Sequence, residues 1–159
     1  MAQPSLNSPC PCGSGKKFKR CCGASGRNQP GLRTTLQGLV AAAVSAYEQG
    51  EMANAGHMID QALALAPTDP AILGIKGMVL FQLGRLDEAA RHIERAIAGS
   101  PKDSRLHNFH GQVLREHANS AQKLEAERAF GRAVSLDPGF VEAWYNLGIA
   151  YKLSGQTSK

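Results

Sequence analysis

A period of 34 residues constrains the fold of this chain more than any other feature of its sequence. Identical residues stand at this spacing in five pairs: Gly50 and Gly84, Ala55 and Ala89, Ile59 and Ile93, Ala62 and Ala96, and Pro67 and Pro101. Gly77, Gly111 and Gly148 recur at spacings of 34 and 37, and Pro138 follows Pro101 by 37. Small residues suit places where two helices cross closely, large apolar residues fill the space between helices, and proline ends a helix pair. The period therefore predicts a stack of helical hairpins.

The repeated part, about residues 36–159, resembles the tetratricopeptide repeat, a helix-turn-helix unit of 34 residues. The resemblance implies an all-α fold, a helical-hairpin solenoid of about seven helices over 32–159. Its repeats run over 36–69, 70–103 and 104–140, with a partial repeat at 141–159. The second repeat fits best, with Leu73, Gly77, Leu80, Gly84, Ala89, Ile93, Ala96 and Pro101 in the pattern. The third is three residues longer, and we expect the additional residues in its inner turn, near 117–120.

The fourth repeat begins at Val141 and matches the pattern through Trp144, Leu147, Gly148 and Tyr151. The sequence stops at Lys159, where the second helix of this repeat should begin. A repeat unit cannot bury its apolar face alone, and the ends of an array normally carry a polar cap. Helix 141–153 is therefore either the cap itself or, in the interpretation that we favour, part of a longer protein.

All four cysteines lie in the segment 9–23, which reads P-C-P-C-G-S-G-K-K-F-K-R-C-C-G. Cys10 and Cys12 form one close pair, and Cys21 and Cys22 form the other. Four thiolates in two pairs suit tetrahedral zinc, which would also supply the folding energy of so short a segment. Two disulfides are an alternative, but adjacent cysteines do not easily bond to each other and cytosolic thiols stay reduced. A phosphate-binding P-loop is excluded, because Cys10 and Lys17 stand where that motif needs Gly and Ser or Thr.

The same segment resembles the SEC-C motif, which is named for the C-terminal tail of the bacterial translocation ATPase SecA. The resemblance covers nearly every position of 9–23 and implies one structural zinc ion held by Cys10, Cys12, Cys21 and Cys22. It also implies that the basic residues bind an acidic chaperone such as SecB, or the ribosome; these residues are Lys16, Lys17, Lys19 and Arg20. In this chain the motif is N-terminal rather than a tail, which leaves the choice of partner open.

The net charge of +5 is concentrated at the N-terminal end. Residues 1–33 contain six of the eighteen Lys and Arg residues and no acid, which favours an anionic partner such as an acidic protein or ribosomal RNA. We expect a disordered tail at 1–8 and a flexible linker at 24–31, both rich in turn-forming and polar residues. No apolar run approaches the roughly 20 residues of a membrane span, and no leader pattern is present, so we expect a cytoplasmic protein.

In tetratricopeptide proteins the first helix of each repeat lines a concave groove. The family's groove positions in this chain are Gln37, Val40, Val44, Tyr47, Gly74, Met78, Phe81, Arg105, Asn108, Gln112, Arg115, Glu142 and Tyr145. This set would be apolar at one end and rich in arginine at the other, which suits a peptide with an apolar stretch and an acid. Alternatively, Val40, Val44 and Met78 are part of the packing. The carboxylate clamp of some members needs Lys and Asn where this chain has Val40 and Val44, so we exclude it.

The sequence contains no recognisable catalytic set, and four cysteines would fill the coordination of zinc without an open position. His107, His110 and His117 are candidates for a second metal site, but no carboxylate or cysteine joins them at a ligand spacing. We therefore predict a non-catalytic protein-interaction adaptor. One alternative is the substrate-recognition region of a longer transferase or oxygenase. Another is nucleic-acid binding through the basic finger, which lacks the interleaved aromatic residues that bind single strands.

Loss of one zinc ligand tests whether the finger and the array fold independently. Cys21→Ser should unfold the finger, because the metal supplies its folding energy, and should leave the helical array standing. Circular dichroism of the variant measures the helix content directly. A collapse of the helical signal would contradict the division into two parts.

Overall fold

The computed structural model describes residue 17 and the ranges 30–116 and 120–154. Seven α-helices occupy the two ranges: α1 Pro30–Glu48, α2 Met52–Leu65, α3 Pro70–Gln82, α4 Leu86–Gly99, α5 Ser104–Glu116, α6 Ser120–Leu136 and α7 Val141–Leu153. They confirm the predicted all-α array. The four cysteines, the tail 1–8 and residues 24–29 of the predicted linker lie outside the described residues.

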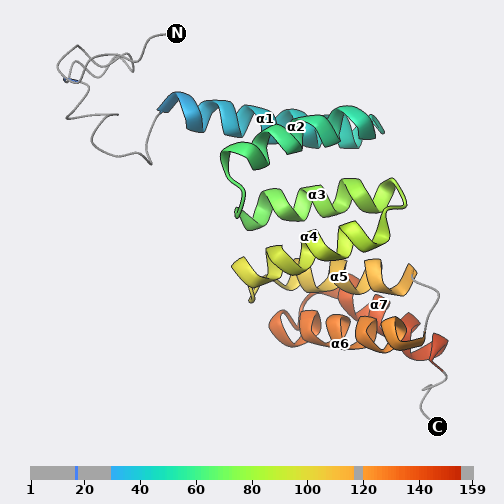
Figure 1. Ribbon diagram of the computed structural model, residues 1–159. Coiled ribbons are helices and arrows are strands. Elements are labelled where there is room, and N and C mark those ends of the chain that lie inside the picture. The colour runs from blue at the N-terminus through green and yellow to red at the C-terminus, as the bar shows by residue number, and fades with distance from the viewer. Residues whose placement is uncertain (1–16, 18–29, 117–119, 155–159) are drawn as a thin grey trace.

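Three helical hairpins stack in one direction, as Figure 1 shows: α1 with α2, α3 with α4, and α5 with α6. Helix α7 packs against both α5 and α6 at the end of the stack. Each hairpin contacts the next through the second helix of one and the first helix of the other. This arrangement is the solenoid that the 34-residue period predicted.

In the second and third hairpins the helices cross where a glycine on the first helix faces a large side chain on the second. A Cβ atom on Gly77 would overlap the Ile93 side chain, and one on Gly111 would lie 2.7 Å from Cδ1 of Phe130. Ile93 and Phe130 are fully buried, as is Ile59 at the corresponding place in the first hairpin. The absence of a Cβ on the two glycines is therefore what allows these helices to approach.

Glycine also ends α1 and α3. Gly50 and Gly84 have φ values of 79° and 72°, in the left-handed region that L side chains rarely adopt. At the first of these turns, Glu51 N donates to Ala46 O at 2.8 Å, and this bond satisfies a carbonyl at the helix end. The recurrence of Gly50 and Gly84 at 34 residues is thus a requirement of the backbone.

The longer third repeat differs from the sequence-based expectation. Helix α5 ends at Glu116 and α6 begins at Ser120, the same separation as between α1 and α2 and between α3 and α4. The additional residues instead lengthen α6, which has 17 residues where α2 and α4 have 14. The segment from Ser120 to Lys123 contains neither glycine nor proline, so the helix can include it. The predicted insertion in the inner turn was therefore wrong.

The start of α1 differs from the predicted end of the linker. Helix α1 begins at Pro30, so the last two residues of the predicted linker belong to the helix. Proline suits the first turn of a helix because its missing N–H would have no partner there.

Helix α7 has the predicted bounds, but its apolar side chains differ in exposure. Leu147 is 6% exposed and packs with Phe130, whereas Trp144 is 52% exposed. Only part of the apolar surface of α7 is thus uncovered among the described residues.

Two of the three candidate histidines, His107 and His110, lie among the described residues, and His117 lies outside them. His107 Nε2 lies 3.0 Å from Pro101 O. His110 Nε2 is buried with no hydrogen-bond partner among the described residues, and Glu94 Oε1 lies 3.6 Å from it. Burial lowers the pKa of the His110 imidazole, because desolvation penalises its charged form. Glu94 and Glu125 oppose this shift, and His107 adds to it. In the part of the chain that the structure describes, no three His, Cys, Asp or Glu side chains are grouped to hold a metal ion.

None of the described helices combines the length and the apolar character that crossing a membrane requires.

Alanine at position 111 tests the close crossing of α5 and α6. Gly111→Ala should lower the free energy of unfolding by about 1–3 kcal/mol, because the new Cβ must displace the buried Phe130 ring. Gly148→Ala is the matched control: outside its own helix backbone, no described atom lies within 4 Å of the Cβ position of Gly148 in α7, and the substitution should raise stability by about 0.5–1 kcal/mol. Urea denaturation measures both. Equal effects of the two substitutions would contradict the packing argument.

The buried imidazole of His110 predicts a loss of stability in mild acid. Its pKa is lower in the folded than in the unfolded chain, so its contribution is present above about pH 6.5 and is lost as the pH falls through the folded value. His110→Gln should therefore lose less stability than the unmodified chain between pH 7.5 and pH 5. Urea denaturation at both pH values measures the difference. An identical loss in both proteins would show that other groups cause the pH dependence.

Candidate functional site

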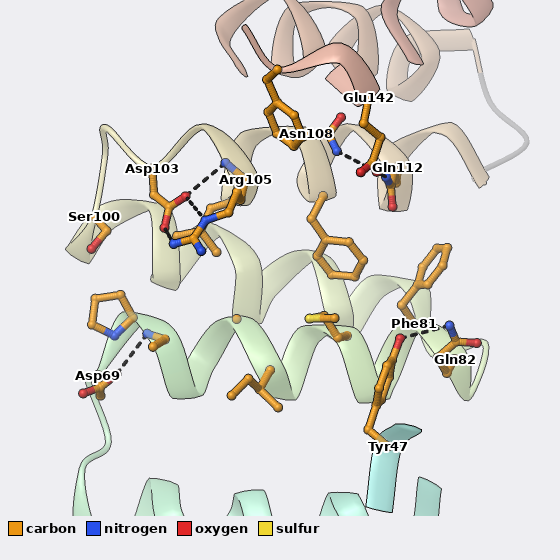
Figure 2. Close-up of a pocket in the computed structure, with 18 residues that line it drawn as sticks. Tyr47, Asp69, Phe81, Gln82, Ser100, Asp103, Arg105, Asn108, Gln112 and Glu142 are labelled. Carbon is orange, nitrogen blue, oxygen red and sulfur yellow. Dashed lines mark hydrogen bonds and ion pairs between the residues drawn. The ribbon is translucent and has the colours of Figure 1, made fainter. Parts of the chain in front are cut away.

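A groove with a volume of about 790 Å³ opens along the first helices of the hairpins. Its walls come from α1, α3, α5 and α7 and from the loops before α3, α5 and α7, as Figure 2 shows. The lining residues are Tyr47, Asp69, Pro70, Ala71, Gly74, Ile75, Met78, Phe81, Gln82, Ser100, Asp103, Arg105, Leu106, Asn108, Phe109, Gln112, Phe140 and Glu142. We call this set the groove.

Most of the side chains predicted for partner binding from the repeats meet in this groove: Tyr47, Met78, Phe81, Arg105, Asn108 and Gln112. Gly74 and Glu142, which were expected at groove positions, also line it. Arg115 does not line it, and neither do Gln37, Val40, Val44 and Tyr145. Of the basic finger residues, Lys17 is described and is exposed, whereas Lys16, Lys19 and Arg20 lie outside the described residues.

The valines of α1 have different surroundings. Val40 is half-buried and packs against the cluster of Ala43, Ile59, Ala62 and Ile72, so it belongs to the packing. Val44 is 37% exposed, as is Met78, but only Met78 lines the groove. The groove therefore begins at Tyr47, near the end of α1.

The middle of the groove is apolar. Met78 and Phe81 of α3 line it opposite Leu106 and Phe109 of α5. The rings of Phe81 and Phe109 meet edge to face, with centroids 5.6 Å apart. At Gly74 a Cβ would lie 3.1 Å from Cδ2 of Leu106, so the glycine keeps the groove open where α3 and α5 are closest. Partly exposed aromatic and thioether side chains offer a surface that apolar side chains of a partner can cover.

One end of the groove, on the left in Figure 2, carries two aspartates, Asp69 before α3 and Asp103 before α5. Asp69 caps α3, because its Oδ1 accepts from Ala71 N at 2.9 Å and from Ile72 N at 3.2 Å. Asp103 accepts from Arg105 in two places, Nε at 3.1 Å and Nη2 at 2.9 Å. The Arg105 hydrogen bonds lower the pKa of the Asp103 carboxyl, although burial partly opposes them. Arg105 is therefore already paired within the chain.

The other end is a hydrogen-bonded network between α5 and α7. Glu142 Oε1 accepts from Asn108 Nδ2 at 3.1 Å and from Gln112 Nε2 at 2.8 Å, as Figure 2 shows. Asn146 Nδ2 donates to Asn108 Oδ1 at 3.1 Å, and both asparagines are buried. Arg115 Nη1 donates to Asn146 Oδ1 at 3.0 Å. The network satisfies the buried amides and fixes the position of the Glu142 carboxylate.

Arg115 is hydrogen-bonded to Asn146 of the network and does not line the groove. Its guanidinium lies over the Phe130 ring, 5.9 Å from the centroid, and its Nη2 is 3.7 Å from Glu116 Oε1. The sequence therefore correctly placed both Arg105 and Arg115 on α5, but each has an acidic side chain of the chain itself beside it. The positive charges of the arginine-rich end that the sequence predicted are therefore offset by Asp103 and Glu116.

The prediction missed Asp69, Asp103, Phe109 and Phe140 as groove residues. The two aspartates and Phe140 stand just before the helices, where the repeat pattern assigns no groove position. A signal was present, because Asp69 precedes Pro70 and Asp103 precedes Ser104, and both are typical starts of a helix. The side chains that cap the first helices thus also form the rim of the groove.

Comparison with known families assigns both parts of the chain. Residues 7–24 match the family model of the SEC-C motif, and residues 46–113 and 129–159 match two tetratricopeptide repeat models. Over 24 residues the chain is 71% identical to the protein translocase subunit SecA of Nitratiruptor sp.. That match covers 15% of this chain and 3% of SecA, so the likeness concerns the motif alone.

Solved tetratricopeptide domains share the fold of the array. The Sgt2 domain of Aspergillus fumigatus has a TM-score of 0.70 at 20% identity, over 76% of this chain and 80% of that one. The first such domain of Spaghetti (RPAP3), solved with the HSP90 peptide SRMEEVD, has a TM-score of 0.70 at 17% identity, over 77% and 94%. At these identities the likeness shows the fold. The chain is thus an N-terminal SEC-C motif followed by an array of tetratricopeptide repeats.

Proposed function

We propose that this chain is a protein-interaction adaptor that binds a peptide or protein segment in its groove. The observation that carries the proposal is the groove itself. It has about 790 Å³ of space, an apolar middle and polar side chains at both ends. Apolar surface provides affinity, and fixed polar groups select the orientation of what binds. The RPAP3 domain of the same fold was solved with a peptide, which supports this class of ligand.

The N-terminal motif supplies a second contact in this proposal. Cys10, Cys12, Cys21 and Cys22 form the donor set of a structural zinc ion, because four thiolates complete a tetrahedral site. The zinc would fold the finger and would leave no position for a substrate, so the proposal assigns it no catalytic role. The basic residues that follow the first cysteine pair would then face an acidic protein or the ribosome; they are Lys16, Lys17, Lys19 and Arg20.

Two contacts on one chain strengthen each other. After the finger has bound, a segment of the same partner assembly meets the groove at a raised effective concentration. Modest affinity at each site is then sufficient for stable association. This is the physical reason for joining a small finger to a repeat array in one adaptor.

Truncation of an exposed groove side chain tests the proposal. Peptides selected from a random dodecamer display library against the full chain should bind Met78→Ala about fivefold more weakly, because an apolar contact is lost. Val44→Ala is the matched control, since Val44 is equally exposed but lies outside the groove. Fluorescence anisotropy measures both affinities. Failure to select any peptide, or equal affinities of the two variants, would overturn the assignment of the groove.

A further inference from the structure

The charges that line the groove are not those of a site for an acidic peptide. Three carboxylates line it, those of Asp69, Asp103 and Glu142, and Arg105 is the only cation among the lining residues that the structure describes. Arg105 is held by two hydrogen bonds to Asp103, so these two side chains compensate each other. Asp69 and Glu142 remain, at opposite ends of the groove in Figure 2. The groove therefore has an excess of negative charge.

Glu142 is placed to accept a cation. Its Oε1 receives the amide hydrogens of Asn108 and Gln112, at 3.1 Å and 2.8 Å. Among the described residues no donor is bonded to its Oε2, and the side chain is exposed. The two amides hold the carboxylate in one orientation, so little side-chain freedom remains to be lost when a donor binds. Charge-assisted hydrogen bonds to a carboxylate are stronger than neutral ones.

The neighbouring cation does not neutralise Glu142. Arg115 extends toward Asn146 and Glu116 and lies over Phe130, and it is not part of the groove lining. Aromatic rings that line the groove suit a long cationic side chain, because its methylene stem is apolar and its head is attracted to ring faces. The lining thus offers an apolar path that leads to a fixed carboxylate.

We propose that the groove binds a basic, apolar peptide segment, with one lysine or arginine of that segment seated on the Glu142 carboxylate. The proposal rests on the peptide-binding function above and names the chemistry of the ligand. Charge complementarity carries it: an acidic segment would meet three carboxylates, and the one available arginine is already paired. The two ends of the protein would then select opposite charges, since the N-terminal finger is basic.

The experiment uses the full chain and three fluorescein-labelled decapeptides of one leucine-rich sequence. They differ only at three positions, which carry lysine, glutamine or glutamate. Glu142→Gln keeps an acceptor oxygen for Asn108 and Gln112 and removes only the charge. Glu125→Gln is the matched control, because Glu125 is exposed on α6 and lies outside the groove. Circular dichroism verifies that both variants are folded, and fluorescence anisotropy measures each affinity.

We expect Glu142→Gln to weaken binding of the lysine peptide about threefold to fivefold, and to leave the glutamine peptide unchanged. Glu125→Gln should leave the affinities of both peptides unchanged. Arg105→Gln should strengthen binding of the lysine peptide, because it releases Asp103 from its partner. The glutamate peptide can also bind the basic finger, so only its response to the groove variants is interpreted. A binding site for acidic peptides would respond in the opposite direction to Arg105→Gln.

Other outcomes separate this inference from the function on which it rests. If Met78→Ala weakens all three peptides while Glu142→Gln weakens none, the groove binds peptides and the assignment of a cation to Glu142 is wrong. If Glu142→Gln weakens the lysine and glutamine peptides equally, the carboxylate acts without regard to charge, and the inference is also overturned. If Met78→Ala affects no peptide, the peptide-binding function itself fails.

Discussion

The close crossing of two helices at a residue without a side chain is the interaction on which this structure depends. Gly77 lies against Ile93 and Gly111 against Phe130, and no side chain could replace either hydrogen without moving a buried neighbour. The crossing sets the distance within the second and third hairpins, and the hairpins then stack because a single unit cannot bury its apolar face. Gly148 continues the series in α7, where no described residue outside its own helix backbone lies within 4 Å of its Cβ position.

The groove forms because the hairpins stack. First helices lie side by side along one surface, and their exposed side chains converge on a shared space of about 790 Å³. Gly74 serves the stack and the groove together, since α3 approaches Leu106 of α5 at this point. The polar network from Asn108 to Asn146 then ties α7 to α5, with both amides buried. The stability of the array and the shape of the groove are therefore set by the same few contacts.

The N-terminal segment and the groove differ in the sign of their charge. The segment before α1 is basic and contains no acid, whereas the groove is lined by more carboxylates than cations. An adaptor with such a division can hold two partners of opposite charge, or two parts of one assembly, without competition between its sites. The groove is not cationic, because Arg105 pairs with Asp103 and Arg115 lies beside Glu116 outside the groove.

The 34-residue period was sufficient to predict the helical hairpins, their number and the crossings, because recurring glycine, alanine and proline have one physical meaning at such a spacing. The C-P-C…C-C segment likewise predicts four zinc ligands from ligand type and spacing, which are local properties, and this stays a prediction because the cysteines lie outside the described residues. Six of the seven groove residues predicted for binding a partner meet in one cavity, and Arg115 does not. Only the tertiary structure decided the length of α6, the covering of Leu147 and the charge of the groove. The covering of Leu147 and the charge of the groove depend on which side chains from separate helices become neighbours, and a periodic pattern along the chain does not contain that information.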